Sequence, residues 1–327
     1  MADHAVEEDD GELFTYRRGR RARWNVAHAR IDESVDEIED STFYNCERLL
    51  TVNTHDGIRR VEKWAFGGCV SLRRIDLKYA VEIDEYAFDD CKNLESVEFG
   101  DRLETIGNGA FSGCNFLPHL KLPSIITIGA SAFSNCKRLT DVELSEQLES
   151  IGTSAFWKCE RLRCIALPLK RDMFEFNQYM QKYNQFEHCE RLTTVDLVGQ
   201  AHTLTVASLH MESWRSEMKE EINRINQVLP NTLADEKTNE IQRWMDSVMD
   251  KMDHYKAEHF SYVKEGITLL ELALWKAKLG EKEDNSEERK TKKDKVDAES
   301  TRKQRRIICG ADTVIKNVLP FLQVSSW

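Results

Sequence analysis

The sequence predicts an α/β fold, a solenoid of stacked repeats followed by an α-helical region. A phrase built around Ala-Phe-x-x-Cys-x-x-Leu recurs between residues 38 and 197. Successive phenylalanines of this phrase are 23, 22, 23, 22, 23 and 30 residues apart. Beyond about residue 205 the apolar residues instead recur three and four apart, which is typical of helices. A fixed period in the twenties indicates small units that stack on one another rather than a single closed core.

A cysteine follows each of these phenylalanines by three residues. The phenylalanines are Phe43, Phe66, Phe88, Phe111, Phe133, Phe156 and Phe186, and the cysteines are Cys46, Cys69, Cys91, Cys114, Cys136, Cys159 and Cys189. The same small residue at the same place in every copy indicates a buried core position. We therefore expect reduced thiols, with only Cys164 and Cys309 outside this cysteine column.

Each repeat is expected to contribute a short strand and a turn. In one copy Val97 and Phe99 are expected to be buried on one side of a strand. Side chains alternate along a strand, so Ser96 and Glu98 must point the other way. Gly107 follows a second extended piece and is expected to allow a sharp turn. One repeat alone leaves its apolar side half bare, so stacking is needed to bury it.

The phrase Ile-Gly-x-x-Ala-Phe-x-x-Cys-x-x-Leu-x-x-Val-x-Leu resembles the BspA-like subclass of the leucine-rich repeat superfamily. Residues 106–117 and 128–139 are clear copies, and six of the seven copies match well. The resemblance implies a curved, right-handed leucine-rich repeat solenoid with a parallel β-sheet on its concave face. It implies a surface that binds a partner, and it implies no chemistry. Members of the subclass range from surface adhesins to intracellular proteins, so the resemblance does not name the partner.

The chain of 327 residues is expected to contain five segments. These are a flexible charged arm at 1–30, a solenoid of about seven repeats at 31–200 with an insertion at 169–185, a helical region at 205–280 that covers the open end of the solenoid, a charged linker at 281–306, and an apolar C-terminal segment at 307–327. Arg23, Trp24 and Val26 are expected to begin a cover for the other end, because terminal repeats need one.

The insertion and the C-terminal part each leave alternatives open. Apolar residues at helical spacing predict an amphipathic helix at 170–185, either as a partner contact or as a bulky closing coil. Further along, stripes typical of packed helices or a coiled coil are expected to be interrupted at Gly266 and to stop at Gly280. The apolar segment from Ile307 would dock on these helices or bind a separate partner.

Composition bears on partners and location. The formal net charge of -11 and the pI of about 5.4 make nucleic acid an unlikely partner and argue against an anionic membrane. No apolar run approaches the ~20 residues of a membrane span. Met1 to Glu12 is acidic with no apolar run after it, so we expect a cytoplasmic protein. Arginine-rich clusters at 17–23 and 302–306 leave the nucleus as the alternative location.

The sequence contains no recognisable catalytic motif. It has no glycine-rich phosphate loop, no Gly-x-Ser-x-Gly, no His-Glu-x-x-His and no Cys-x-x-Cys. His188 beside Cys189 would be a candidate pair, but the cysteine belongs to the core column. We therefore expect no catalytic residue, no cofactor, no metal site and no small-molecule substrate.

The expected binding surface is the concave sheet, whose outward positions flank each buried strand residue. These positions are Arg74, Asp76, Ser96, Glu98, His119, Lys121, Asp141, Glu143, Cys164, Ala166, Thr194 and Asp196. Five carboxylates against one Arg and one Lys give a formal balance of -3, a rigid acidic strip that favours a basic protein segment. The sequence thus predicts a non-enzymatic protein–protein interaction scaffold. A surface adhesin or glycan binder, and a nuclear or RNA-associated factor that uses the arginine clusters, are the alternatives.

Overall fold

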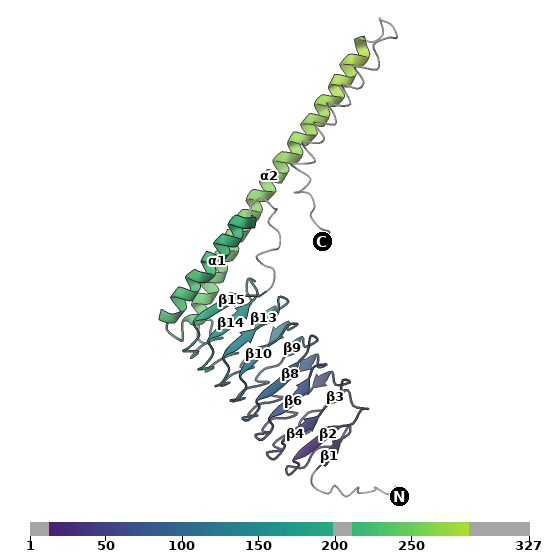
Figure 1. Ribbon diagram of the computed structural model, residues 1–327, viewed down its shortest axis with the longest axis vertical. Coiled ribbons are helices and arrows are strands. Elements are labelled where there is room, and N and C mark those ends of the chain that lie inside the picture. The colour runs from purple at the N-terminus through teal and green to yellow at the C-terminus, as the bar shows by residue number, and fades with distance from the viewer. Residues whose placement is uncertain (1–12, 199–210, 288–327) are drawn as a thin grey trace. The chain divides into compact units, whose positions relative to one another are not determined.

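The computed structural model describes residues 13–198 and 211–287. The described residues fall into two compact units: residues 13–198 with 218–249, and residues 211–217 with 250–287. The first unit contains the repeats, and each repeat forms one coil of a solenoid (Figure 1). The predicted solenoid and helical C-terminal region are confirmed.

The strands that follow the cysteine column form two parallel sheets. The first has the order β1 (Leu13–Tyr16), β2 (His28–Ile31), β4 (Thr51–Asn53), β6 (Arg74–Leu77) and β8 (Ser96–Phe99), and the second has the order β10 (His119–Lys121), β12 (Asp141–Glu143), β14 (Cys164–Leu167) and β15 (Thr194–Leu197). Neighbouring strands come from successive coils, so the sheets grow by one strand with each repeat.

The two sheets part between β8 and β10, where Pro118 precedes β10. In most other coils the residue at this place donates its backbone N–H to the previous coil, as Glu95 does to Arg73 O and Thr140 does to Pro118 O. Proline has no N–H to donate, so the ladder loses a bond there. Val97 and Phe99 of β8 are consequently only half-buried, whereas full burial was expected for them.

A third sheet of six two-residue strands runs along another side of the coils. Its members are β3 (Glu37–Ile38), β5 (Arg60–Val61), β7 (Glu82–Ile83), β9 (Thr105–Ile106), β11 (Thr127–Ile128) and β13 (Ser150–Ile151). The glycine after this strand is required by close approach rather than by the sharp turn that we expected at Gly107. A Cβ added at Gly107 would lie 2.6 Å from the backbone nitrogen of Glu85, and one at Gly152 would lie 2.3 Å from that of Ala130.

The core of the solenoid is a continuous stack of phenylalanine rings. All seven repeated phenylalanines are fully buried, and each is stacked on the next with ring centroids 5.0–5.6 Å apart. Such a stack buries the largest apolar side chain of every coil against its neighbours, which supplies the main hydrophobic stabilisation of the repeat. Each coil therefore depends on packing against the next coil for its stability.

The column cysteines are buried thiols that bond to the preceding coil. The Sγ of Cys69 donates to the carbonyl oxygen of Phe43 at 3.1 Å, and Cys91 donates to that of Phe66 at 3.1 Å. The same bond recurs in the remaining copies down to Cys189, and Cys46 bonds to Arg23 O at 3.4 Å. Among the described cysteines all eight are free. Each of these phenylalanine carbonyls also accepts the backbone N–H of the cysteine in its own coil, as Phe66 O does from Cys69 N at 3.1 Å, so the thiol adds a second donor that comes from the next coil.

The solenoid begins earlier than expected. Residues 13–30 were predicted to belong to a flexible arm, but this segment contains β1 and most of β2. Strand β1 pairs in parallel with β2 from Leu13 to Tyr16. Phe14 and Tyr16 are 8% and 0% exposed, and the backbone N–H of Glu39 donates to the Tyr16 hydroxyl at 3.2 Å. These alternating aromatic residues extend the core by one coil, so the boundary that we expected at residue 30 is wrong.

Part of the first arginine cluster is held against this end of the solenoid. Arg17 forms an ion pair with Asp32 at 3.2 Å, and Arg18 pairs with Asp36. Trp24, which we expected to help cover this end, is 73% exposed. It therefore contributes little to the cover, whereas Val26 is buried.

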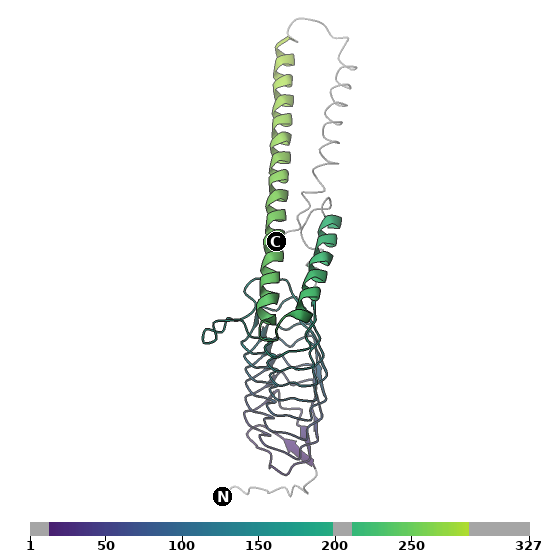
Figure 2. The same cartoon turned by 90° about the vertical axis from the view of Figure 1, so that its left-hand side faces the viewer.

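The insertion is a loop, not the amphipathic helix that its spacing predicted. Ile151 donates its N–H to Met173 O at 2.8 Å and accepts from Glu175 N at 3.0 Å, so this segment extends the third sheet beside β13. The Asn177 side chain then accepts two backbone N–H groups at 3.0 Å and sets a tight turn, a local alternative to helix. The rest of the loop projects from the last coils as the teal hairpin in Figure 2, and Tyr179 in it is fully exposed.

Two helices follow the solenoid, and their inner parts pack on the last coil. They are α1 (Met211–Val228), a 3₁₀ turn at Leu229–Asn231 that contains Pro230, and α2 (Lys237–Glu287). Asn226 bonds through its side chain to both the N–H and the C=O of Val195, at 2.8 and 3.1 Å. Thr238 Oγ1 accepts the N–H of Phe186 at 2.9 Å. Side chains of the helices thus satisfy backbone groups at the end of the stack, where no further coil follows.

The second helix is continuous over 51 residues. It passes through Gly266 and Gly280, where we expected an interruption and an end. An isolated glycine costs a helix only about 1 kcal/mol, which a long helix tolerates. Pairing of its outer part as a coiled coil stays a prediction. The charged linker from residue 288, the second arginine cluster and the segment from Ile307 lie outside the described residues. No helix in the described ranges has the length and apolar character needed to cross a membrane.

Candidate partner-binding face

The structure places the predicted binding residues on the outward side of the strands. Arg74 is opposite Ser96, and Asp76 is opposite Glu98 in the register of β6 and β8. The intervening Ile75 is buried, so these four side chains form two parallel rows on the open side of the sheet. We call the outward side of the two long-strand sheets the strand face.

The rows continue on the second sheet. His119 and Lys121 lie opposite Asp141 and Glu143, which in turn lie opposite Cys164 and Ala166. Thr194 and Asp196 complete the rows on β15. The gap at Pro118 therefore divides the predicted site into a β6–β8 part and a β10–β15 part.

The strand face is less acidic than the outward positions alone indicated. Lys78, in the turn after β6, lies 3.4 Å from Asp76 and 2.6 Å from Glu98. Arg163, just before β14, lies 3.5 Å from Asp141. Counting these two cations changes the balance of the rows from -3 to -1.

Within the part of the chain that the structure describes, Asp196 is the carboxylate of the rows for which no ion pair is found. Glu143 pairs with Lys121 at 3.3 Å, while Asp196 accepts only the N–H of Leu197 at 2.8 Å. The remaining negative charge is therefore concentrated at the β15 end.

Sequence reasoning missed the N-terminal third of this face. The outward residues of β1, β2 and β4 are Leu13, Thr15, His28, Arg30, Thr51 and Asn53, and they continue the rows through β6. His28 Nδ1 lies 2.8 Å from Thr51 Oγ1. The alternation of Phe14 and Tyr16 could have revealed the first of these strands. It was overlooked because this part of the sequence lacks the Ala-Phe-x-x-Cys phrase.

The one candidate catalytic pair does not form a site. His188 is exposed and its ring packs at 6.0 Å against Trp157, whereas Cys189 is buried and bonds to Phe156 O at 3.1 Å. Burial raises the pKa of the Cys189 thiol, which disfavours the reactive thiolate. In residues 13–198 and 211–287, His, Cys, Asp and Glu side chains do not gather into a group that could hold a metal ion.

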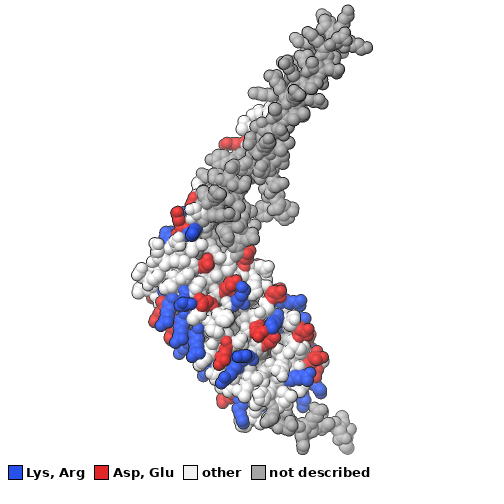
Figure 3. All heavy atoms as spheres, in the orientation of Figure 1, with Lys and Arg blue, Asp and Glu red and all other residues white. Residues whose placement is uncertain are grey.

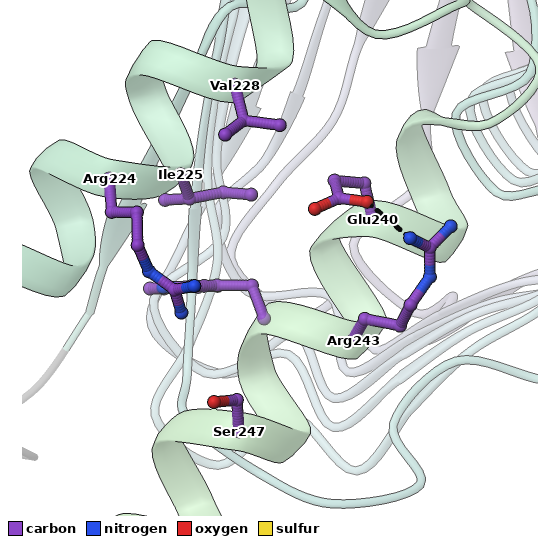
Figure 4. Close-up of a pocket in the computed structure, with 7 residues that line it drawn as sticks. Arg224, Ile225, Val228, Glu240, Arg243 and Ser247 are labelled. Carbon is purple, nitrogen blue, oxygen red and sulfur yellow. Dashed lines mark hydrogen bonds and ion pairs between the residues drawn. The ribbon is translucent and has the colours of Figure 1, made fainter.

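A shallow pocket lies between α1 and α2 (Figure 4). It is lined by Arg224, Ile225, Val228, Glu240, Arg243, Trp244 and Ser247. Its two guanidinium groups are already paired, Arg224 with Glu221 at 2.6 Å and Arg243 with Glu240 at 2.6 Å. The pocket therefore offers no free charge for an anionic ligand, and the strand face remains the candidate site.

Comparison with known proteins identifies repeat proteins. Similar solved structures include a leucine-rich cell surface protein of Faecalibacterium prausnitzii (22% identity, 53% of this chain and 60% of that chain, TM-score 0.36). Others are a leucine-rich repeat protein of T. pallidum (23%, 58% and 76%, 0.38) and one of Bacteroides ovatus (21%, 58% and 64%, 0.39). The chain covers less than two thirds of the F. prausnitzii and B. ovatus chains. No curated protein matches.

The family model of the BspA type leucine rich repeat region, in six copies, matches residues 22–124 and 107–216. These ranges include every coil from β2 to β15 and more than half of the chain. Together with the stacked phenylalanines and the parallel strands, this match shows that the chain belongs to the BspA-type leucine-rich repeat family.

Proposed function

We propose that the chain is a non-enzymatic scaffold that binds a protein partner through the strand face. The observation that carries the proposal is the register of β6 with β8 and of β10 through β15, which sets the outward side chains in parallel rows. The backbone hydrogen bonds of the sheets hold these rows before any partner arrives. A preorganised surface loses little conformational entropy on binding, which favours recognition of another protein.

A basic segment is the partner chemistry that the carboxylates of β12 and β15 favour. Asp141 and Glu143 pair with Arg163 and Lys121 of this chain, but these pairs are exposed. Exposed ion pairs contribute about 0–1 kcal/mol, so a partner's Lys or Arg can replace the internal cation at little cost. Asp196, for which no ion pair with a described residue is found, adds a carboxylate that has no such cation to displace.

The test is a charge reversal on the strand face. The variant Glu98→Lys, Asp141→Lys, Glu143→Lys should remain folded, because each of the three side chains is about half exposed or more. We expect the loss of three exposed pairs to cost no more than about 2 kcal/mol. Recovery of the main partner of the native protein in an affinity pull-down should be abolished, and its binding to wild type should weaken with salt.

A matched control carries the same change in charge elsewhere. Glu47, Glu146 and Glu149 are exposed and lie off the strand face. The variant Glu47→Lys, Glu146→Lys, Glu149→Lys should recover the partner as wild type does. Equal recovery by the folded strand-face variant would contradict the proposal and move the interaction to the loop at 176–183 or to the segment from Ile307.

A cytoplasmic location is part of this proposal. An import receptor that binds the first arginine cluster would have to displace the exposed ion pairs of Arg17 with Asp32 and of Arg18 with Asp36, at a cost of about 0–1 kcal/mol each. Imaging of a fluorescent fusion tests the location. Nuclear accumulation would favour a nuclear or RNA-associated factor, and display at the cell surface would favour an adhesin or a glycan-binding protein.

A further inference from the structure

Three arginines occupy the same place in the last three coils. Arg138, Arg161 and Arg191 each follow a column cysteine by two residues, and all three are exposed. Because the column cysteines bond from coil to coil, residues at equal distance from them stack along the solenoid. We call Arg138, Arg161 and Arg191 the arginine ladder. Figure 3 shows Lys and Arg side chains gathered along this edge of the last coils.

The fold does not require arginine at this position. The equivalent residues of the earlier coils are Arg48, Ser71, Asn93 and Phe116. The spacing of the coils at the ladder follows from the ring stack, which steps 5.4 Å from Phe133 to Phe156 and 5.6 Å from Phe156 to Phe186. Like charges side by side at such spacing repel one another and reduce stability. The arginine ladder therefore reduces the stability of the last coils through charge repulsion, which the earlier coils avoid.

The ladder charges are not neutralised within the chain. Over the described ranges, no ion pair involves Arg138, Arg161 or Arg191, in contrast to Arg224 and Arg243 between the helices. Arg138 instead lies over the Phe116 ring, with its guanidinium carbon 4.1 Å from the ring centroid. A cation–π contact orients a cation without removing its charge.

Neighbouring cations add to the ladder. The turn segments 137–138, 158–163 and 188–191 contain six Lys and Arg side chains against two carboxylates, Glu160 and Glu190. Lys158 lies over the Trp157 ring at 4.1 Å, and of these six cations only Arg163 forms an ion pair with another described residue, Asp141. This edge is therefore locally basic on a chain whose net charge is -11.

We propose that the arginine ladder binds an acidic run of about four residues in a protein partner. Two coil steps place the outer arginines about 11 Å apart. An extended peptide rises about 3.3 Å per residue, so three to four residues span the ladder. A long polyanion such as nucleic acid would also meet the negative charge of the rest of the chain, whereas a short acidic segment meets only the basic edge. The ladder uses other residues than the strand face, so either proposal can fail alone.

The test measures binding of a fluorescent peptide with a central Glu-Glu-Asp-Asp run to the full chain by anisotropy. We expect saturable binding that weakens with salt and is absent for the Gln-Gln-Asn-Asn peptide. Arg161→Glu should weaken it by at least about tenfold, since charge reversal at the middle of the ladder replaces attraction by repulsion. Arg48→Glu is the matched control, because it makes the same change at the same place of a coil that is followed by coils with Ser71 and then Asn93 at this place. It should change the affinity less than about threefold, and both variants should melt as wild type.

Three results would overturn the proposal. One is the absence of saturable binding of the acidic peptide up to about 1 mM protein. Another is an equal loss in the two variants, which would mean that net charge and not the ladder governs binding. The third is tighter, Arg161-dependent binding of a single-stranded oligonucleotide of the same charge, which would assign the edge to nucleic acid.

Discussion

The ammonium group of Lys237 donates a hydrogen bond to the backbone carbonyl oxygen of Leu192 at 2.6 Å. Two further carbonyl oxygens, of Cys189 and Glu190, lie 3.2 and 2.8 Å from the same nitrogen. The Lys237 side chain is 2% exposed, and this burial lowers its pKa. The first residue of α2 thus takes the place of the next coil, which would otherwise cover the last turn of the stack.

Replacement of Lys237 by methionine should be strongly destabilising. The apolar side chain keeps the volume, but it leaves the carbonyl groups of Glu190 and Leu192 without their donor, whereas Cys189 O keeps the N–H of Leu192. We expect a loss of about 3 kcal/mol or more in the free energy of unfolding, measured by urea denaturation. Lys219→Met, at an exposed position of α1, is the control and should change stability by less than about 0.5 kcal/mol. A loss below about 1 kcal/mol for Lys237→Met would show that the bonds to the last turn do not hold the end of the stack.

Truncation tests the covering of the end as a whole. A chain that ends at Met249 keeps the parts of α1 and α2 that belong to the solenoid unit. It should be soluble and melt cooperatively. A chain that ends at Gln200 loses Asn226, Lys237 and Thr238 and exposes the apolar end of the Phe186 coil, so it should self-associate. Sedimentation velocity distinguishes the two, and a monomeric, equally stable chain ending at Gln200 would refute the role of the helices.

The column thiols should be inert in the native protein. Burial raises the pKa of Cys46 to about 11, and burial likewise raises the pKa of Cys91 and Cys114. Alkylation at pH 8 followed by intact-mass measurement should modify the column cysteines only after unfolding. Cys114→Ala removes the sulfur donor to Phe88 O but leaves the N–H of Cys91, so it should cost about 1 kcal/mol. A reductant-dependent mass change in protein kept reduced would contradict the prediction.

Asp32 should titrate well below an ordinary aspartate. The Ser34 hydroxyl and backbone N–H donate to it at 2.6 and 3.1 Å and Arg17 lies 3.2 Å away, which lowers its pKa from 3.8 to about 2. Because the folded-state pKa is lowered, its stabilising contribution is complete above about pH 4 and is lost as the pH falls through 2. Carbon-detected NMR titration should show this value, and Ser34→Ala should raise it toward 3.8. An unchanged pKa in Ser34→Ala would exclude the serine as the main cause.

The fold was predictable where the repeat phrase places the same residue at the same position of every coil. Phe111 and Cys114 have the same neighbours in each copy, so their burial follows from the spacing alone. The first coil was not predicted, because Phe14 and Tyr16 make the same core contacts without the phrase. The helix that we predicted in the insertion was wrong. Met173 and Phe174 have a spacing that suits a helix, but they pair with Ile151 in the third sheet, at the place where the other repeats have the Ile-Gly strand.

The charge of the binding face was predictable only in part. Alternation along the strands places Asp76 and Asp141 outward, and the structure agrees with this. Their cations, Lys78 and Arg163, come from turn positions whose direction strand alternation does not determine. The arginine ladder was missed for the same reason, since it lies on turns and becomes a cluster only when the coils stack.

The missing ladder bond at Pro118 has a consequence for how the solenoid opens. The coils before and after it share the phenylalanine stack and the third sheet, but not the long-strand ladder. Amide hydrogens of β6 and those of β14 should therefore exchange with solvent at separate rates, because each sheet can open locally without the other. Restoring a donor with Pro118→Ala would couple the two halves into one cooperative unit. The single proline thus sets a boundary for cooperativity inside a molecule whose core is uninterrupted.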